Sequence, residues 1–336
     1  MRHRCRTSDC WPTCCCFLAI DRDTGVAPFA GRYSARPRGL PTAAGRPDRR
    51  RAKSLFRRSA SCYRRRRNGG DRCGMTDGGA RIDYEGRPGR AGGGRVARLF
   101  IDRAAKRNAI GPGVIAGLKD ACAELAADGE LRAVVLAGAG GRTFAAGADV
   151  NTMAGLTPDS ARAFITSLHE AIDAVRTLPV PVIAAIRGHC LGAAVELAAA
   201  CDFRVGDTTT VIAMPEVRVG IPSVIEAALL PGLIGWGAAR EMLLTGREYG
   251  AEEAARIGFL QKVTAPDDLD AAIDAWLDAI LACGPAAVRT QKSLLNRWQE
   301  MSLSEAVAVS IDAFAASFET DEPARMLARA LKPRNG

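Results

Sequence analysis

Two glutamates stand where they could do acid–base chemistry. Glu196 lies in an apolar, alanine-rich run that begins after Gly192, and Glu216 follows twenty residues later, directly after Pro215. Two carboxylates in one crevice can divide a proton-transfer task, because one accepts a proton while the other donates one. Each glutamate also has a plainer interpretation. Glu196 could be an exposed residue favoured by a helix dipole, and Pro215-Glu216 an ordinary surface turn.

Two groups of small residues could bring backbone amides close to a ligand. Residues 146–149 read Ala-Gly-Ala-Asp, and residues 192–194 read Gly-Ala-Ala. Amide groups from two different loops can together form an oxyanion hole for a carbonyl oxygen. The alternative for residues 146–149 is simple packing followed by a turn aspartate.

The elements that must position these groups can be predicted from composition. Residues 182–186 are apolar and rich in β-branched side chains, which predicts a buried strand, and the alanine and leucine content from 193 to about 200 predicts a helix. A second buried strand is predicted over 132–138, with a loop of small residues over 143–149, and a short strand over 210–213 precedes Glu216. In open α/β sheets ligands bind beyond the carboxyl ends of the strands, so we expect the three features to converge.

The remainder of the chain alternates strands and helices and then becomes helical. Further strands are predicted over 96–102, 202–205 and 259–263. Helices are predicted over 112–127, 159–178 and 269–334. A helical pattern also begins at 223 and is interrupted at 231 and 235. This order predicts an α/β fold with a largely parallel sheet flanked by helices, followed by a helical C-terminal region.

Charge and cysteine are concentrated in residues 1–74, which we call the leader. The leader carries 19 of the 46 basic and five of the 37 acidic residues, a net charge of +14, so residues 75–336 carry −5 and the total of +9 says little about the folded part. The leader has no periodicity and is expected to be disordered. It could be an arginine-rich targeting peptide, a basic arm that binds nucleic acid, or upstream sequence translated from a misplaced start, with Met75 as the true beginning. We favour the last interpretation.

The cysteines and histidines of the remaining chain do not suggest a metal site. Seven of the 11 cysteines lie in the leader, and the others, Cys122, Cys190, Cys201 and Cys283, are isolated in apolar segments, which suits a reducing cytoplasm. None of these four pairs with another at metal-ligand spacing, and the chain has three histidines. No run approaches the about 20 apolar residues that a membrane helix needs.

The motifs together resemble the enoyl-CoA hydratase/isomerase (crotonase) family. The resemblance runs from about residue 93 to 334 and rests on these segments, in the family's order and spacing: Arg107-Asn108-Ala109, Thr143–Asp149, Pro181–Gly188, Gly192–Ala198, Cys201–Phe203, Pro215-Glu216 with Gly220–Pro222, and Leu244–Arg247 with Ala254–Gly258. It implies a crotonase-like spiral of ββα units over 93–265 and a helical trimerisation region over 266–336, which forms a homotrimer or a dimer of trimers. Residues 75–92 are expected to be a flexible linker.

The resemblance also implies roles for single residues. Ala148 and Ala193 would donate the amides of the oxyanion hole, and Glu196 and Glu216 would be the catalytic carboxylates. We take Glu196 as the base on water and Glu216 as the acid at C2, and the reverse assignment stays open because both can hold the same water. The residues implied in binding substrate and CoA are Arg107, Asn108, Ala109, Ala146, Gly147, Asp149 and Gly192.

The pair of glutamates favours hydration of a 2-trans-enoyl-CoA to a 3-hydroxyacyl-CoA, with no metal or redox cofactor, since CoA arrives as part of the substrate. The alternatives are an enoyl-CoA delta-isomerase or another crotonase-type acyl-CoA lyase, and, from a different class, RNA binding through the leader. Two segments depart from the family pattern: Gly192-Ala193-Ala194 replaces three glycines, and residues 220–230 replace a glycine-rich segment. Glu226 in the second segment is expected to lie on a helix surface.

Overall fold

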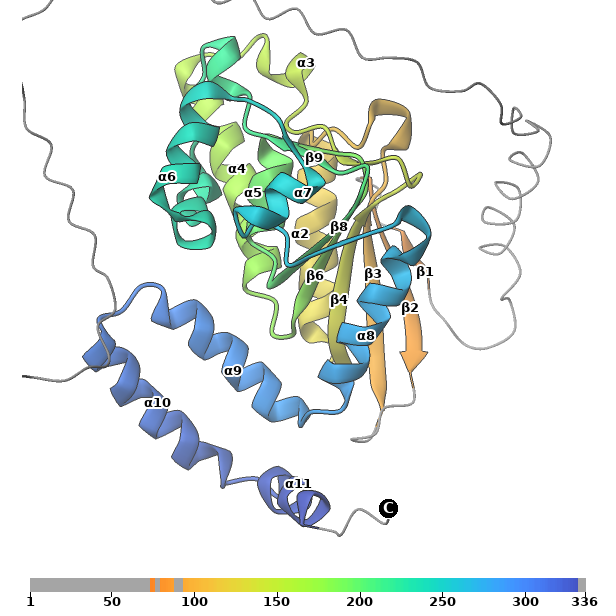
Figure 1. The fold of residues 1–336 in the computed structure, drawn as a ribbon, viewed down its shortest axis with the longest axis vertical. Coiled ribbons are helices and arrows are strands. Elements are labelled where there is room, and N and C mark those ends of the chain that lie inside the picture. Colours follow the sequence, from red (N-terminus) through yellow and green to blue (C-terminus); the bar gives the residue numbers. More distant parts are fainter. Residues whose placement is uncertain (1–72, 76–78, 88–92, 332–336) are drawn as a thin grey trace, which may run out of the picture. The chain divides into compact units, whose positions relative to one another are not determined.

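The computed structural model describes residues 73–75, 79–87 and 93–331 (Figure 1). A seven-stranded sheet has the order β1-β2-β3-β4-β6-β8-β11, and a four-stranded sheet has the order β10-β9-β7-β5. The strands are β1 (Cys73–Met75), β2 (Ala80–Arg87), β3 (Gly94–Ile101), β4 (Leu131–Gly138), β5 (Thr143–Ala145), β6 (Val182–Ile186), β7 (His189–Leu191), β8 (Phe203–Asp207), β9 (Val211–Ala213), β10 (Tyr249–Gly250) and β11 (Lys262–Thr264).

Helices connect the strands and make up the C-terminal region. The α-helices are α2 (Pro112–Ala127), α3 (Val150–Met153), α4 (Pro158–Arg176), α5 (Ala193–Ala199), α6 (Leu230–Thr245), α7 (Ala251–Arg256), α8 (Leu269–Leu281), α9 (Pro285–Trp298), α10 (Leu303–Ser317) and α11 (Glu322–Ala330). The 3₁₀ turns are η1 (Ala104–Lys106), η2 (Glu216–Val219), η3 (Ile225–Leu229) and η4 (Pro266–Asp268). The sequence prediction of α2 and β6 is confirmed at both ends, and the helical C-terminal region is confirmed as α8 to α11.

The large sheet is buried on both faces, as its hydrophobic composition predicts. In β4, Val134 and Leu136 join the core cluster that includes α2 and α4, whereas Ala133 and Val135 join a second cluster with Leu277 of α8 and its neighbours. Strands β3, β4, β6, β8 and β11 run parallel, and only β1–β2 and β2–β3 pair antiparallel. The sheet is therefore the mainly parallel, helix-covered layer that the alternating pattern predicts.

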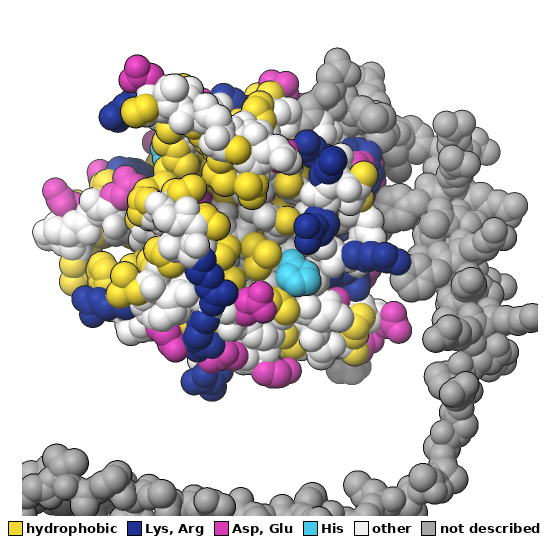
Figure 2. All heavy atoms as spheres, turned by 90° about the horizontal axis from the view of Figure 1, so that it is seen from above, with side chains coloured by type: hydrophobic (Ala, Val, Ile, Leu, Met, Phe, Trp, Pro, Cys, Tyr) yellow, Lys and Arg dark blue, Asp and Glu magenta, His cyan; other side chains and the backbone are white. Residues whose placement is uncertain are grey.

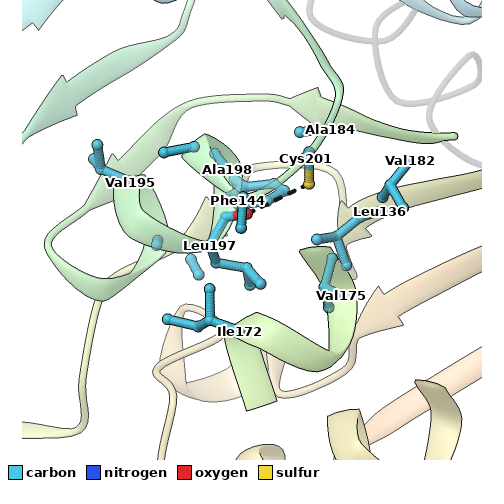
Figure 3. Packing of buried hydrophobic residues seen from close by; sticks show 14 of the residues in the cluster. Leu136, Phe144, Ile172, Val175, Val182, Ala184, Val195, Leu197, Ala198 and Cys201 are labelled. Carbon is cyan, nitrogen blue, oxygen red and sulfur yellow. Dashed lines mark hydrogen bonds between the residues drawn. The ribbon is translucent and has the colours of Figure 1, made fainter. Parts of the chain in front are cut away.

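Helix α5 is enclosed on all sides, although it has only seven residues. Figure 3 shows Leu197 and Cys201 at this helix packed near Leu136 of β4 and near Ile172 and Val175 of α4. The Cys201 thiol donates to the carbonyl of Leu197 at 3.4 Å, and burial raises the thiol's pKa to about 12. Because its surroundings are close-packed, α5 gives Glu196 a fixed platform.

Residues 80–87 correct the expectation of a flexible linker over 75–92. They form β2, which pairs antiparallel with β3 from Ala80↔Ile101 to Arg87↔Gly94. Ala80 and Ile82 are buried at alternate positions, so β2 has the period of a half-buried strand, which the glycines around it hid. Residues 1–72, which hold nearly all of the predicted leader, lie outside the described residues, so its disorder and its origin stay predictions.

Within the described ranges, no single helix is long and apolar enough to cross a membrane. The segments 266–281 and 285–298 reach the required length and hydropathy only when taken together, across a bend of 107°. Helix α8, within the first segment, buries Leu269, Ile273 and Leu277 against the large sheet, as a core helix does.

Candidate active site

Three neighbouring parallel strands of the small sheet carry the three features that the sequence singled out. Strand β5 ends just before residues 146–149, β7 ends just before Gly192, and β9 ends three residues before Glu216. Strand β7 pairs parallel with β5 on one side and with β9 on the other. The predicted convergence at the carboxyl ends of parallel strands therefore occurs, but the sequence did not reveal β5 and β7, which have only three residues each.

The turn at Gly192 is the point where the three features meet. A Cβ atom added to Gly192 would lie 2.4 Å from Oε1 of Glu216 and 3.9 Å from Cα of Gly147. A Cβ atom added to Gly147 would lie 2.7 Å from the carbonyl oxygen of Leu191 and 3.8 Å from the amide nitrogen of Ala193. Both glycines have positive φ, +54° and +81°, so glycine is required here for conformation as well as for space.

The amides proposed for the oxyanion hole are available. Two backbone hydrogen bonds of Ile110 lie on either side of Ala148: the Ile110 amide donates to the Gly147 carbonyl, and the Asp149 amide donates to the Ile110 carbonyl. The Ala148 amide takes part in neither bond. Ala193 is the first residue of α5, where an N–H has no partner within the helix. Neither amide donates a backbone hydrogen bond within the described residues.

Glu196 is buried in the first turn of α5, with 4% of the residue exposed. Burial and the nearby charges of Glu216 and Glu226 raise its pKa to about 8, whereas hydrogen bonding to the amides of Val224 and Ala227 acts in the opposite direction. The plainer interpretation of an exposed helix-end glutamate is therefore wrong. The raised pKa favours the protonated form of Glu196 in the free protein.

Glu216 is half-buried at the start of η2, and it is held by a residue that the sequence analysis missed. The Ser223 hydroxyl donates to Oε2 of Glu216 at 2.9 Å. Ser223 lies in the segment 220–230, which departs from the family pattern, and this departure was the only indication in the sequence that its residues have a special role. The bond leaves Oε1 of Glu216 beside Gly192.

Glu226 is not on a helix surface, contrary to expectation. It lies in η3, where 6% of the residue is exposed, and its Oε1 is 2.5 Å from Nδ1 of His169 on α4. Turn η3 packs against both α5 and α4. The helical periodicity of the segment could not reveal this, because a short 3₁₀ turn directs its side chains differently from an α-helix.

The segment 107–109 has a structural role at Asn108. The Asn108 side chain is 1% exposed; it donates to the carbonyls of Ala139 and Thr143 at 3.0 and 2.9 Å and accepts from the Arg103 amide. This side chain therefore joins two loops, and contact between Asn108 and CoA stays a prediction. Arg107 is exposed and Ala109 is half-buried, and their contact with CoA stays a prediction.

Asp149 also stabilises the fold locally. Its Oδ1 accepts from the Asn151 amide at 3.1 Å and so caps α3, while its Oδ2 accepts from Arg103 at 2.7 Å. The Arg103 hydrogen bond lowers the pKa of Asp149. Ala146 donates its amide to the carbonyl of Arg107 at 3.1 Å, which fixes the start of the loop that leads to Gly147.

Figure 2 shows a face on which hydrophobic side chains surround a hollow, with lysine and arginine side chains at its margin.

Within the described residues, no group of three or more His, Cys, Asp and Glu side chains could hold a metal ion.

A family model described as enoyl-CoA hydratase/isomerase matches residues 92–330. The chain belongs to the enoyl-CoA hydratase/isomerase family. Crotonyl-CoA hydratase of Syntrophomonas wolfei is 33% identical over 229 residues, which are 68% of this chain and 88% of that protein. Short-chain-enoyl-CoA hydratase of Clostridium acetobutylicum is 32% identical over 230 residues, with the same two shares covered.

Solved structures of the same family share the fold. The crystal structure of an enoyl-CoA hydratase from Bacillus anthracis has a TM-score of 0.67 at 28% identity and covers 69% of this chain and 91% of its own. An enoyl-CoA hydratase/carnithine racemase from Magnetospirillum magneticum has a TM-score of 0.69 at 31% identity and covers 76% and 92%. The crotonase fold expected from the resemblance is thus the fold of this family member.

Proposed function

We propose that the protein adds water to the C2–C3 double bond of a 2-trans-enoyl-CoA and forms the 3-hydroxyacyl-CoA. The observation that carries this proposal is the meeting of Glu216, Gly192 and Gly147 at one point, with the buried Glu196 one helical turn away. The relatives named as crotonyl-CoA and short-chain-enoyl-CoA hydratases support hydration over the isomerase and lyase alternatives.

The thioester oxygen binds to the amides of Ala148 and Ala193 in this proposal. Negative charge grows on that oxygen when water attacks C3, and two preorganised donors stabilise it. Removing one donor of this kind typically lowers the rate by about 10²–10³-fold. Gly147 and Gly192 allow the two loops to approach each other, and in this proposal the exposed Arg107 and the half-buried Ala109 contact CoA.

The two carboxylates carry the protons. Glu216 lies beside Gly192, which precedes the Ala193 amide, and in this proposal it is the acid at C2. Glu196, further along α5, is then the carboxylate for the water at C3. Because the raised pKa favours protonated Glu196 in the free protein, in this proposal its proton passes to Glu216 before Glu196 accepts one from water. Positioned proton transfer of this kind contributes about 10²–10⁴ in rate.

We further propose that the protein is a cytoplasmic homotrimer, or a dimer of trimers, and that it needs no cofactor besides the CoA of its substrate. An apolar groove of about 730 Å³ lies on the last turn of α9 and along α10, and a second copy of the chain would cover it. Its lining residues are Trp298, Met301, Leu303, Ala306, Val307, Ser310, Ile311 and Phe314. The free thiols Cys122, Cys190 and Cys201 are buried, as suits a reducing compartment.

The decisive experiment is an assay with crotonyl-CoA and with a 3-enoyl-CoA, followed by the same assay on Glu196→Gln and Glu216→Gln. We expect hydration of crotonyl-CoA, and a fall in kcat of at least about 10²-fold in each variant while KM changes little. If the protein instead isomerises the 3-enoyl-CoA faster than it hydrates crotonyl-CoA, the isomerase alternative is the correct function. Full activity of Glu196→Gln would rule out the two-carboxylate mechanism.

A further inference from the structure

Glu226 is a buried carboxylate to which the proposed mechanism assigns no role. One of its oxygens, Oε1, lies 2.5 Å from Nδ1 of His169. Its other oxygen, Oε2, is buried without a hydrogen-bond partner among the described residues. Burying a carboxylate is unfavourable unless the group is paired and hydrogen-bonded, so the position of Glu226 calls for an explanation.

The turn that carries Glu226 is strained. Ile225 has φ +43°, although it is β-branched and disfavours the left-handed region more than most residues do. Such a conformation persists only when surrounding contacts hold it. The hydrogen bond from His169 on α4 to Glu226, the residue after Ile225, is such a contact.

The same turn lies against the helix that carries Glu196. The amide of Ala227 donates to the carbonyl of Val224 at 3.0 Å, which closes the turn around Ile225 and Glu226. Turn η3 packs against α5, which carries Glu196, and against α4, which carries His169. A chain of contacts therefore runs from His169 through Glu226 and the strained turn to α5.

We propose that His169 and Glu226 are positioning residues, which hold the strained turn 224–227 against α5 and so fix the place of Glu196 on that helix. The pair acts through Glu196 and takes no part in the proton transfers. The proposal rests on the proposed function only in that Glu196 is taken to be the group whose orientation matters.

Glu226 also acts on Glu196 through its charge. It is one of the two carboxylates whose negative charge favours the protonated form of Glu196. The titration of Glu196 in Glu226→Gln therefore reports whether the turn holds Glu226 close to Glu196.

Three variants and a control on the full chain test the proposal. His169→Leu removes the donor, and His169→Asn keeps an N–H donor near the place of Nδ1. Glu226→Gln keeps size and hydrogen bonding but removes the charge. The control is Glu170→Gln, which breaks the exposed Lys119–Glu170 ion pair on the same helix. The readouts are kcat and KM with crotonyl-CoA, thermal unfolding, and an infrared titration of the Glu196 carboxyl band, identified by its loss in Glu196→Gln.

We expect His169→Leu to lower kcat by about 10–10²-fold with KM nearly unchanged, because a small misplacement of a catalytic group slows the chemical step. His169→Asn should recover most of this loss, Glu226→Gln should lower the apparent pKa of Glu196, and Glu170→Gln should stay within about twofold of wild type. Normal kcat in folded His169→Leu, no recovery in His169→Asn, or an unchanged Glu196 titration in Glu226→Gln would each overturn the proposal. If the wild-type protein does not hydrate crotonyl-CoA, the proposed function fails, while the infrared titration still decides the role of the pair.

Discussion

The hydroxyl of Ser223 donates a 2.9 Å hydrogen bond to Oε2 of Glu216. The bond links the segment after Pro222 to the start of η2 and orients the carboxylate so that Oε1 lies beside Gly192. Among the described side chains that hydrogen-bond to Glu216, Ser223 is the only one. It is therefore the contact through which the orientation of Glu216 can be tested.

Ser223→Ala should lower kcat with crotonyl-CoA by about tenfold, since a hydrogen bond to a charged group contributes about 1.5–3 kcal/mol. Ser223→Thr keeps the hydroxyl and should retain most of the activity. Steady-state kinetics on both variants measure the difference. Equal losses in the two variants would mean that the hydroxyl is not what matters.

Gly192→Ala should abolish most of the activity. The added methyl group would lie 2.4 Å from Oε1 of Glu216, and φ of +54° is strained for alanine. Gly129→Ala is the matched control, because nothing lies within 4 Å of a Cβ atom at that position. We expect a fall in kcat of about 10²-fold or more in the first variant and wild-type kinetics in the second. A fully active Gly192→Ala enzyme would contradict the proposed place of Glu216.

Proton exchange at C2 can separate the roles of the two glutamates. In deuterated water, a carboxylate next to C2 should exchange the C2 proton of saturated butyryl-CoA without any hydration. We expect Glu216→Gln to lose this exchange and Glu196→Gln to retain it, which mass spectrometry of the recovered thioester would show. The opposite pattern would exchange the two proposed roles.

The raised pKa of Glu196 should make the protein less stable at alkaline pH. Burial moves this pKa from 4.5 to about 8, so the folded protein binds the proton more tightly than the unfolded chain. The contribution to stability is fully present below pH 4.5 and is lost as pH rises through 8. Glu196→Gln should therefore raise Tm relative to wild type at pH 9, on the order of 5 °C, and change it little at pH 5. Differential scanning calorimetry at both pH values measures this, and an equal shift at both would indicate a cause other than ionisation.

The groove on α10 should mediate assembly. Ile311 and Phe314 are 65% and 70% exposed in the single chain, which is high for large apolar side chains on one helix face. The double variant Ile311→Asp with Phe314→Asp should sediment as a monomer in analytical ultracentrifugation, whereas wild type should sediment as a trimer or hexamer. Ala308→Asp, an exposed residue of the same helix outside the groove, is the control. A monomeric wild type would remove the assembly proposal.

Long, regular elements could be predicted from the sequence because their patterns repeat. The proline near its start and the amphipathic spacing of 112–127 define α2, and the apolar run 182–186 defines β6. Strands β5 and β7 escaped prediction because three residues are too few to show a period of two. Strand β2 escaped it because glycine-rich flanks diluted its alternation.

The part of the candidate site that consists of motif residues could be predicted from the sequence. The residues around Gly147, Gly192 and Glu216 come together as their positions after strands imply. The surroundings of the two catalytic candidates could not be predicted, because Ser223 and Glu226 belong to an irregular segment, and His169 contacts that segment from α4. The left-handed conformation of Ile225, in particular, contradicts the preference of an isoleucine and depends on its neighbours in space.

The small sheet and the segment 216–229 divide the site into a constant and an adjustable part. Backbone pairing between β5, β7 and β9 sets the loops that would grip the thioester, and such pairing tolerates exchange of side chains. The contacts around the two carboxylates come instead from the segment 216–229, which lies outside either sheet. Substitutions in that segment would therefore change the surroundings of the carboxylates and leave intact the strand pairing behind the loops.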